Sequence, residues 1–290
     1  MKRLHLLSFI LAGWWCGTAL AISSEPSARP LRVVSQTVGT DELLLALAEP
    51  EQIAALSHFS RESVFSAVAE RAKAFPRVER LGDAESVLRY NPTLVLVANY
   101  SRVELVAQVR RAGVRVIVFE HHETLEDAFA NLRVLACELG GEAPARAARI
   151  VADCEARVRA LAARLTGLPP VRVIAPSTYG MIAGAETTFQ DMCDHAGAIN
   201  LAATLGGLRG HEAPPNEQML TWPIDRVVVA GEDNESALAL FRKLPPYQFM
   251  AAVRAGRVAL IKPYMLSSVT HHRVEAYEML ARALHPEAYP

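Results

Sequence analysis

Tyrosine, histidine and methionine side chains recur in this sequence directly after segments that we predict to be β-strands. In a parallel α/β sheet, ligands collect beyond the carboxyl ends of the strands, so residues at these places are the first candidates for a site. Tyrosine and histidine combine an apolar ring with an oxygen or nitrogen that can bind a metal ion already held by a chelator. The candidates for ligand binding are Thr37, Tyr100, His121, His122, Tyr179, Met181, Tyr264, His271 and His272. Their types favour a large metal chelate of iron or cobalt, such as a ferric siderophore, haem or cobalamin.

The histidines also allow a second hypothesis, in which the ligand is a bare divalent metal ion. Two adjacent side chains point in different directions, so we expect at most one residue of each His-His pair to face a cleft. No pair of histidines has the i, i+4 spacing that would place both rings on one helix face. A bare-metal site would therefore have to assemble from distant parts of the chain, with the ligands His58, His121, Glu186 and His271.

Other classes of function lack support in the sequence. The chain contains no nucleophile elbow, no Ser/His/Asp order and no zinc-protease motif, so we do not expect an enzyme. Asp41 and Glu42 stand in the first turn of a predicted helix, where they would repel a phosphate, and no nucleotide-binding glycine motif is present. With a formal net charge of -1, the chain is not expected to bind nucleic acid, and we predict no intrinsic cofactor.

The candidates are positioned by short strands that alternate with amphipathic helices, a pattern typical of parallel α/β sheets. We predict an N-terminal α/β lobe at residues 31–143, with strands near 32–35, 53–56, 94–98 and 115–119 and helices that include 40–48 and 61–73. A long helix at 144–166 follows and is long enough to link two lobes. The C-terminal α/β lobe is predicted at 167–290.

The N-terminus has the features of an export signal. Lys2 and Arg3 precede an apolar run, and Ala19-Leu20-Ala21 has the small-x-small spacing of a cleavage site. We predict a removable signal peptide at residues 1–21 and a flexible leader at 22–30, rather than lipidation at Cys16. For Cys137, Cys154 and Cys193, both a Cys137–Cys154 disulfide and free buried thiols are consistent with the sequence.

Three segments resemble the class III periplasmic binding proteins, which carry ferric siderophores, haem and vitamin B12 to import ABC transporters. They are RVVSQTVGTDELL at 32–44, NPTLVLV at 91–97 and AGRV at 255–258. The resemblance covers about residues 31–287 and departs from the family at Thr93, where an aspartate is usual. It implies two Rossmann-like lobes joined by one long α-helix, with the ligand held between them.

The resemblance also implies the location and the partners of the chain. We expect a periplasmic monomer that meets an inner-membrane ABC permease with its ATPase. In the family, an acidic residue on each lobe contacts arginines of the transporter. Two segments of this chain, 85–97 and 217–229, echo one another, and each begins with an acid, so the resemblance points to Glu85 and Glu217 as the docking residues.

Overall fold

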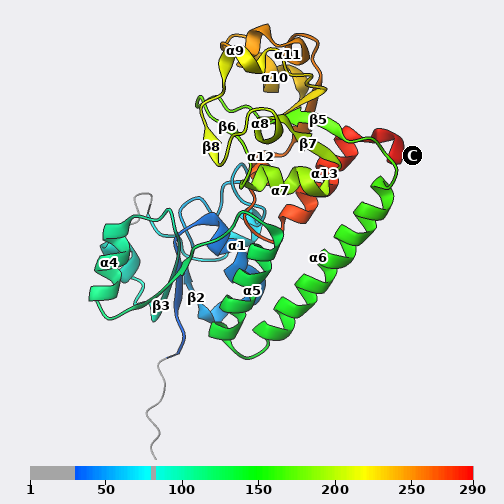
Figure 1. The fold of residues 1–290 in the computed structure, drawn as a ribbon. Helices are drawn as coiled ribbons and strands as arrows, with labels where there is room; N and C mark the ends of the chain where they lie inside the picture. The colour runs from blue at the N-terminus through cyan, green and yellow to red at the C-terminus, as the bar shows by residue number, and fades with distance from the viewer. Residues whose placement is uncertain (1–29, 80–82, 290) are drawn as a thin grey trace, which may run out of the picture.

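Two parallel β-sheets, each with four strands, organise the part of the chain that the computed structural model describes, residues 30–79 and 83–289 (Figure 1). The predicted signal peptide at 1–21 and nearly all of the predicted leader at 22–30 lie outside these residues. No helix in the described ranges is both long and apolar enough to cross a bilayer. The α/β class predicted from the alternation of strands and helices is confirmed.

The first sheet has the strand order β2-β1-β3-β4. Its strands are β1 (Val33–Ser35), β2 (Ile53–Ala55), β3 (Leu94–Ala98) and β4 (Arg115–Phe119). β3 is a continuous apolar run that is buried along its whole length, as expected for a central strand covered on both faces. The helices around the first sheet are α1 (Val38–Leu47), α2 (Ala69–Ala72), α3 (Ala84–Leu88), α4 (Val103–Arg111) and α5 (Leu125–Leu139), and a 3-10 turn lies at Pro50–Gln52.

The second sheet has the order β10-β9-β5-β7. Its strands are β5 (Val171–Ile174), β7 (Ala198–Asn200), β9 (Arg226–Ala230) and β10 (Val258–Ile261), and an antiparallel pair is formed by β6 (Ile182–Ala183) and β8 (His211–Glu212). The helices around it are α7 (Thr188–His195), α8 (Leu201–Thr204), α9 (Asn216–Met219), α10 (Asn234–Ala239), α11 (Ala251–Arg254), α12 (Pro263–Leu266) and α13 (Arg273–Leu284), with 3-10 turns at Tyr247–Phe249 and Pro286–Ala288.

One long helix, α6 (Ala143–Leu165), connects the two halves of the molecule. It begins beside α5 and ends close to the start of β5, so that it runs along one side of both sheets (Figure 1). A single hydrophobic cluster extends from α1 and α5 through α6 to α7 and α13, and includes Leu44, Leu132, Leu161, Met192 and Leu280. Because the halves share this packed core, we expect only small relative motion between them.

The segment at 61–73 differs from its prediction, because only Ala69–Ala72 is helical. Two buried carboxylates supply the reason. The backbone N–H of Ser57 donates to Asp41 at 2.9 Å, and that of Ala67 donates to Glu42 at 3.0 Å. These acceptors on α1 bind one backbone donor before the segment, at Ser57, and one within it, at Ala67, and the chain between them forms turns instead of a helix.

The three cysteines of the described chain are all free. Cys137 is exposed, whereas Cys154 and Cys193 are buried. Of the two alternatives that the sequence left open, the structure has free thiols, although one of them is not buried.

Candidate ligand-binding groove

A groove follows the carboxyl ends of the strands from the first sheet to the second. We divide it into the Phe59 pocket of about 480 Å³, the Tyr100 pocket of about 370 Å³ and the inter-sheet pocket of about 360 Å³. The first two share His58 and Phe59. A narrow cavity joins the last two, because it shares Thr37 and Tyr100 with one and His122 with the other.

His122 occupies the junction between the two sheets. It follows β4 and lines both the narrow cavity and the inter-sheet pocket. Its ring meets the Tyr100 ring edge-on, with centroids 5.6 Å apart and an interplanar angle of 82°. Its Nδ1 is buried and has no hydrogen-bond partner in the described chain. A buried ring nitrogen without a partner is costly, so this atom is the clearest candidate for contact with a ligand.

Tyr100 follows β3 and stands across the groove from the second sheet. The residue is 61% exposed, and its hydroxyl is hydrogen bonded to Thr37, which caps α1. Displacement of water by surrounding protein raises the pKa of this phenol, while the bond with Thr37 acts in the opposite direction. The phenol is therefore protonated at neutral pH and presents an apolar ring with a polar tip to the groove.

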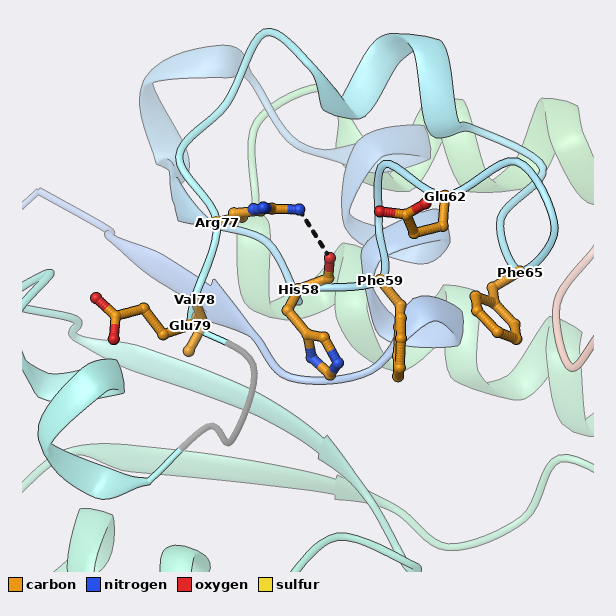
Figure 2. Close-up of a pocket in the computed structure, with 7 residues that line it drawn as sticks. All are labelled: His58, Phe59, Glu62, Phe65, Arg77, Val78 and Glu79. Carbon is orange, nitrogen blue, oxygen red and sulfur yellow. Dashed lines mark hydrogen bonds between the residues drawn. The ribbon is translucent and has the colours of Figure 1, made fainter.

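Three rings form the wall of the Phe59 pocket (Figure 2). The centroids of His58 and Phe59 are 3.7 Å apart, and those of Phe59 and Phe65 are 4.8 Å apart. Phe59 and Phe65 are 39% and 51% exposed, which is unusual for phenylalanine. Arg77 lies beside the backbone of His58 and donates to its carbonyl oxygen at 3.4 Å. Glu62 and Glu79 also line this pocket, so it combines exposed aromatic faces with charged side chains of both signs.

The second sheet contributes a different set of side chains. Met181 lines the inter-sheet pocket after β5, and Ser267 and Val269 line it after α12. His211 on β8 and Glu186 also border it, and Glu186 forms an ion pair with Arg209. The two walls together can contact a ligand of substantial area through apolar groups while offering nitrogen, oxygen and sulfur atoms at its edge.

The model of the family described as periplasmic binding protein matches residues 33–265 of this chain. The chain belongs to this family. The class III binding proteins that the sequence resembled are thereby confirmed as its relatives. Similarity extends to a cobalamin-binding protein of Halobacterium salinarum, which is 23% identical over 276 residues and covers 92% of this chain and 72% of that protein.

Two solved structures show the same fold as this periplasmic binding protein. The apo form of the heme-binding protein RhuT from Roseiflexus sp. RS-1 is 26% identical, with a TM-score of 0.74, and the match covers 89% of this chain and 99% of that one. A periplasmic heme-binding protein from Pseudomonas aeruginosa is 25% identical, with a TM-score of 0.75, covering 90% and 95%. The two-lobed architecture is therefore shared along nearly the whole chain.

The residues predicted from sequence fall into two groups. Thr37, Tyr100, His122 and Met181 line the groove of the binding protein. His121 is exposed and does not line these pockets, which agrees with the expectation that one residue of the pair at most would face the cleft. Tyr179 is 92% exposed in the loop after β5 and lines none of the pockets described above. Tyr264 packs against the large hydrophobic cluster.

His271 and His272 lie away from the groove, at the start of α13. Desolvation, followed by the charge of the neighbouring His272 and by Arg157 and Arg71, lowers the pKa of His271 to about 3. Desolvation, with Arg71 and Arg157, lowers the pKa of His272 to about 4. Both rings are neutral at physiological pH. They do not line the groove pockets, so the structure does not bring them together with Tyr100 and His122.

The four ligands named for a bare metal ion are also not assembled. His58 lies in the Phe59 pocket, Glu186 lies across the groove in its pair with Arg209, and His271 is half-buried, with its carbonyl oxygen near Cys154 of α6. Within residues 30–79 and 83–289, no group of three or more His, Cys, Asp or Glu side chains could hold a metal ion.

Sequence reasoning missed several residues of the groove. Phe59 lies just beyond the end of β2, so the rule of strand ends should have selected it beside His58. Phe65 was missed because it lies in the segment 61–73, which was wrongly predicted to be a helix, and a helix would point its ring in a different direction. His211 carried no signal, because its strand consists of two residues and pairs with a segment almost 30 positions earlier.

The loop that carries Phe59 and Phe65 is held by Asp41 and Glu42, which the sequence analysis placed in the first turn of a helix without any role in binding this loop. Asp41 and Glu42 are buried, and besides its bond with Ala67, Glu42 accepts from the hydroxyl of Thr270 at 2.6 Å. Glu42 therefore ties the loop of the first sheet to the segment before α13. Burial raises the pKa of each carboxyl group to about 7.

These acids predict how stability depends on pH. The pKa of Glu42 is higher in the folded state than in the unfolded state, because burial favours the protonated carboxyl group. The stabilisation of the fold by protonated Glu42 is therefore fully present below pH 4.5 and is lost as the pH rises to about 7. We expect Glu42→Gln to remove this loss, on the order of 3 kcal/mol, so that the variant gains unfolding free energy relative to the wild type between pH 5 and 8. Urea unfolding at each pH measures the difference. The control is Glu70→Gln at an exposed acid of α2, and parallel curves for Glu42→Gln and the wild type would contradict the prediction.

Proposed function

We propose that this chain is the periplasmic substrate-binding component of an ABC import system and that it carries a bulky macrocyclic metal chelate, haem or cobalamin, in the groove between its two sheets. The observation that carries the proposal is the junction of the groove, where the His122 ring with its unpartnered Nδ1 stands edge-on to Tyr100. The names of the relatives, one cobalamin-binding and two heme-binding, support the class of ligand.

The chemistry of the walls suits a chelate better than a bare ion. A chelate fills most of the coordination positions of its metal, so a protein needs to supply only one or two further ligands. The Nδ1 of His122 or the oxygen of Tyr100 is such a ligand, and the exposed faces of Phe59 and Phe65 offer contact with the apolar surface of a macrocycle. A bare ion requires three or more protein ligands in one place.

Export and transporter docking belong to the same proposal. The signal peptide at 1–21 would deliver a soluble monomer to the periplasm, where it would meet an inner-membrane permease with its ATPase. Glu85 on α3 and Glu217 on α9 are exposed, and each helix precedes an inner strand of its sheet, β3 or β9. These matching places support the two acids as docking residues on the two lobes. The chain itself would bind without catalysis and hold no cofactor of its own.

Isolation of the exported protein tests the nature of the ligand. We expect the protein from a periplasmic extract, grown with haemin or cyanocobalamin in the medium, to retain a coloured ligand with the absorption spectrum of one of them. Elemental analysis should then find iron or cobalt only in proportion to that chromophore. Stoichiometric zinc or manganese without a chromophore would contradict the proposal and favour the bare-metal hypothesis.

A further inference from the structure

A buried arginine at the start of α13 is bonded to the backbone that carries His122. The side chain of Arg273 is 2% exposed. Its Nη2 donates to the carbonyl oxygen of His122 at 2.6 Å and to that of Ser268 at 3.0 Å, and its Nη1 donates to the carbonyl oxygen of Glu123 at 2.9 Å. Two consecutive carbonyl groups of the first half of the molecule are thus held by one side chain of the second half.

The charge of Arg273 is balanced by Asp191 of α7, which accepts from its Nη1 at 2.9 Å. Asp191 also accepts from the hydroxyl of Tyr277 and from the backbone N–H of Leu125 at 3.3 Å. Leu125 is the first residue of α5, and a carboxylate is stabilised near a helix N-terminus. The ion pair therefore fixes residues 122–125, the part of the connection between β4 and α5 that lies next to α5.

The rest of this segment is held less firmly from the outside. Glu120 and His121 are exposed, and their carbonyl oxygens accept from Asn99 and Asn131 at the surface. The backbone N–H of His122 is satisfied by the neighbouring Glu123 side chain at 3.0 Å. The bonds from Arg273 to the carbonyl oxygens of His122 and Glu123 are partly buried and charge-assisted, and such bonds are about twice as strong as neutral ones.

We propose that Arg273 is a positioning residue for ligand binding, which fixes the His122 ring at the junction of the groove by holding the carbonyl groups of His122 and Glu123. This inference rests on the proposed function, since it gives His122 its role in contacting the ligand. A lysine at this place keeps the positive charge, but its single ammonium group cannot reproduce the planar fork that reaches two carbonyls and Asp191 together. The side chain acts through His122 and does not itself line the groove pockets.

A double-mutant cycle with haemin as the probe tests the inference. We expect Arg273→Lys to raise the Kd for haemin by about 10-fold when His122 is present and by less than about 2-fold in the His122→Ala background, because the two residues act as one unit. Equal losses in both backgrounds would overturn the inference, since they would mean that Arg273 supports the fold and not His122. An unchanged Kd for Arg273→Lys would overturn it as well.

A second arginine–carboxylate pair that also involves α13 supplies a control. Arg157 of α6 binds both carboxylate oxygens of Glu278 on α13, at 2.9 and 2.7 Å, without contact to the 122–125 segment. We expect Arg157→Lys to leave the haemin Kd unchanged within about 2-fold. If Arg273→Lys fails to fold, the paired change Arg273→Met with Asp191→Asn takes its place, because it removes both buried charges together.

A measurement without ligand separates this inference from the proposed function. In protein labelled with ¹⁵N-histidine, the ring signals of His122 are assigned by their loss in His122→Ala. We expect Arg273→Lys to shift and broaden these signals in the apo protein, and Arg157→Lys to leave them in place. Unchanged His122 signals in Arg273→Lys would refute the positioning role, whether or not any chelate binds.

Discussion

Replacement of both Tyr100 and His122 by alanine is expected to raise the Kd for haemin or cobalamin by about 100-fold or more. The two rings meet at the junction of the groove, and each presents an atom that can contact a metal or the edge of a macrocycle. Loss of a well-placed contact residue costs about 2 kcal/mol or more, and each 1.4 kcal/mol is tenfold in affinity. Titration of each variant with the coloured chelate, followed by absorbance, measures the change.

The chain offers a closely matched control for this prediction. His121 and Tyr179 are the same two residue types, each follows a strand, β4 or β5, and neither lines the groove pockets. We expect His121→Ala with Tyr179→Ala to change the Kd by less than about 3-fold, which is the usual range for exposed positions. If the control variant loses as much affinity as Tyr100→Ala with His122→Ala, the ligand does not bind at the junction formed by Tyr100 and His122.

Removal of the Arg273 charge alone should have the largest effect on stability. Arg273→Met leaves Asp191 buried without its cation, although the hydroxyl of Tyr277 and the N–H of Leu125 remain bonded to it. Breaking a buried pair in this way costs about 3–5 kcal/mol of unfolding free energy. Urea unfolding of the purified variants at pH 7 measures the loss.

A second arginine shows what an accessible pair contributes. The side chains of Arg157 and Glu278 are 38% and 37% exposed, so Arg157→Met should cost at most about 1 kcal/mol. If Arg273→Met loses as little unfolding free energy as Arg157→Met, water reaches the Arg273–Asp191 pair, and the pair does not hold the two halves of the molecule together.

The fold was largely predictable because its signals are local. The continuous apolar run of β3 and the helical periodicity of α6 identify their elements without knowledge of any partner. The one clear failure, the helix predicted at 61–73, has a long-range cause. The carboxylate of Glu42 binds the backbone of this segment from 25 residues earlier in the chain, and that of Asp41 binds Ser57 just before the segment.

The candidate site was predictable only where a strand directly precedes it. Tyr100 and His122 follow β3 and β4, so the rule of strand ends located them. His271 and His272 follow α12 instead, and their distance from the groove depends on how α13 packs against α6. The roles of Glu42 and Arg273 were invisible for the same reason, since Thr270 and the carbonyl of His122 lie 228 and 151 positions away from them.

Equilibrium titration of the mature protein with haemin, cyanocobalamin and free divalent metal ions tests the central claim most directly. The groove predicts saturable binding of one of the two chelates at micromolar concentration or below, with no stoichiometric binding of a bare ion. Tight binding of zinc or manganese alone, with neither chelate bound, would contradict the claim that the groove between the two sheets carries a metal chelate.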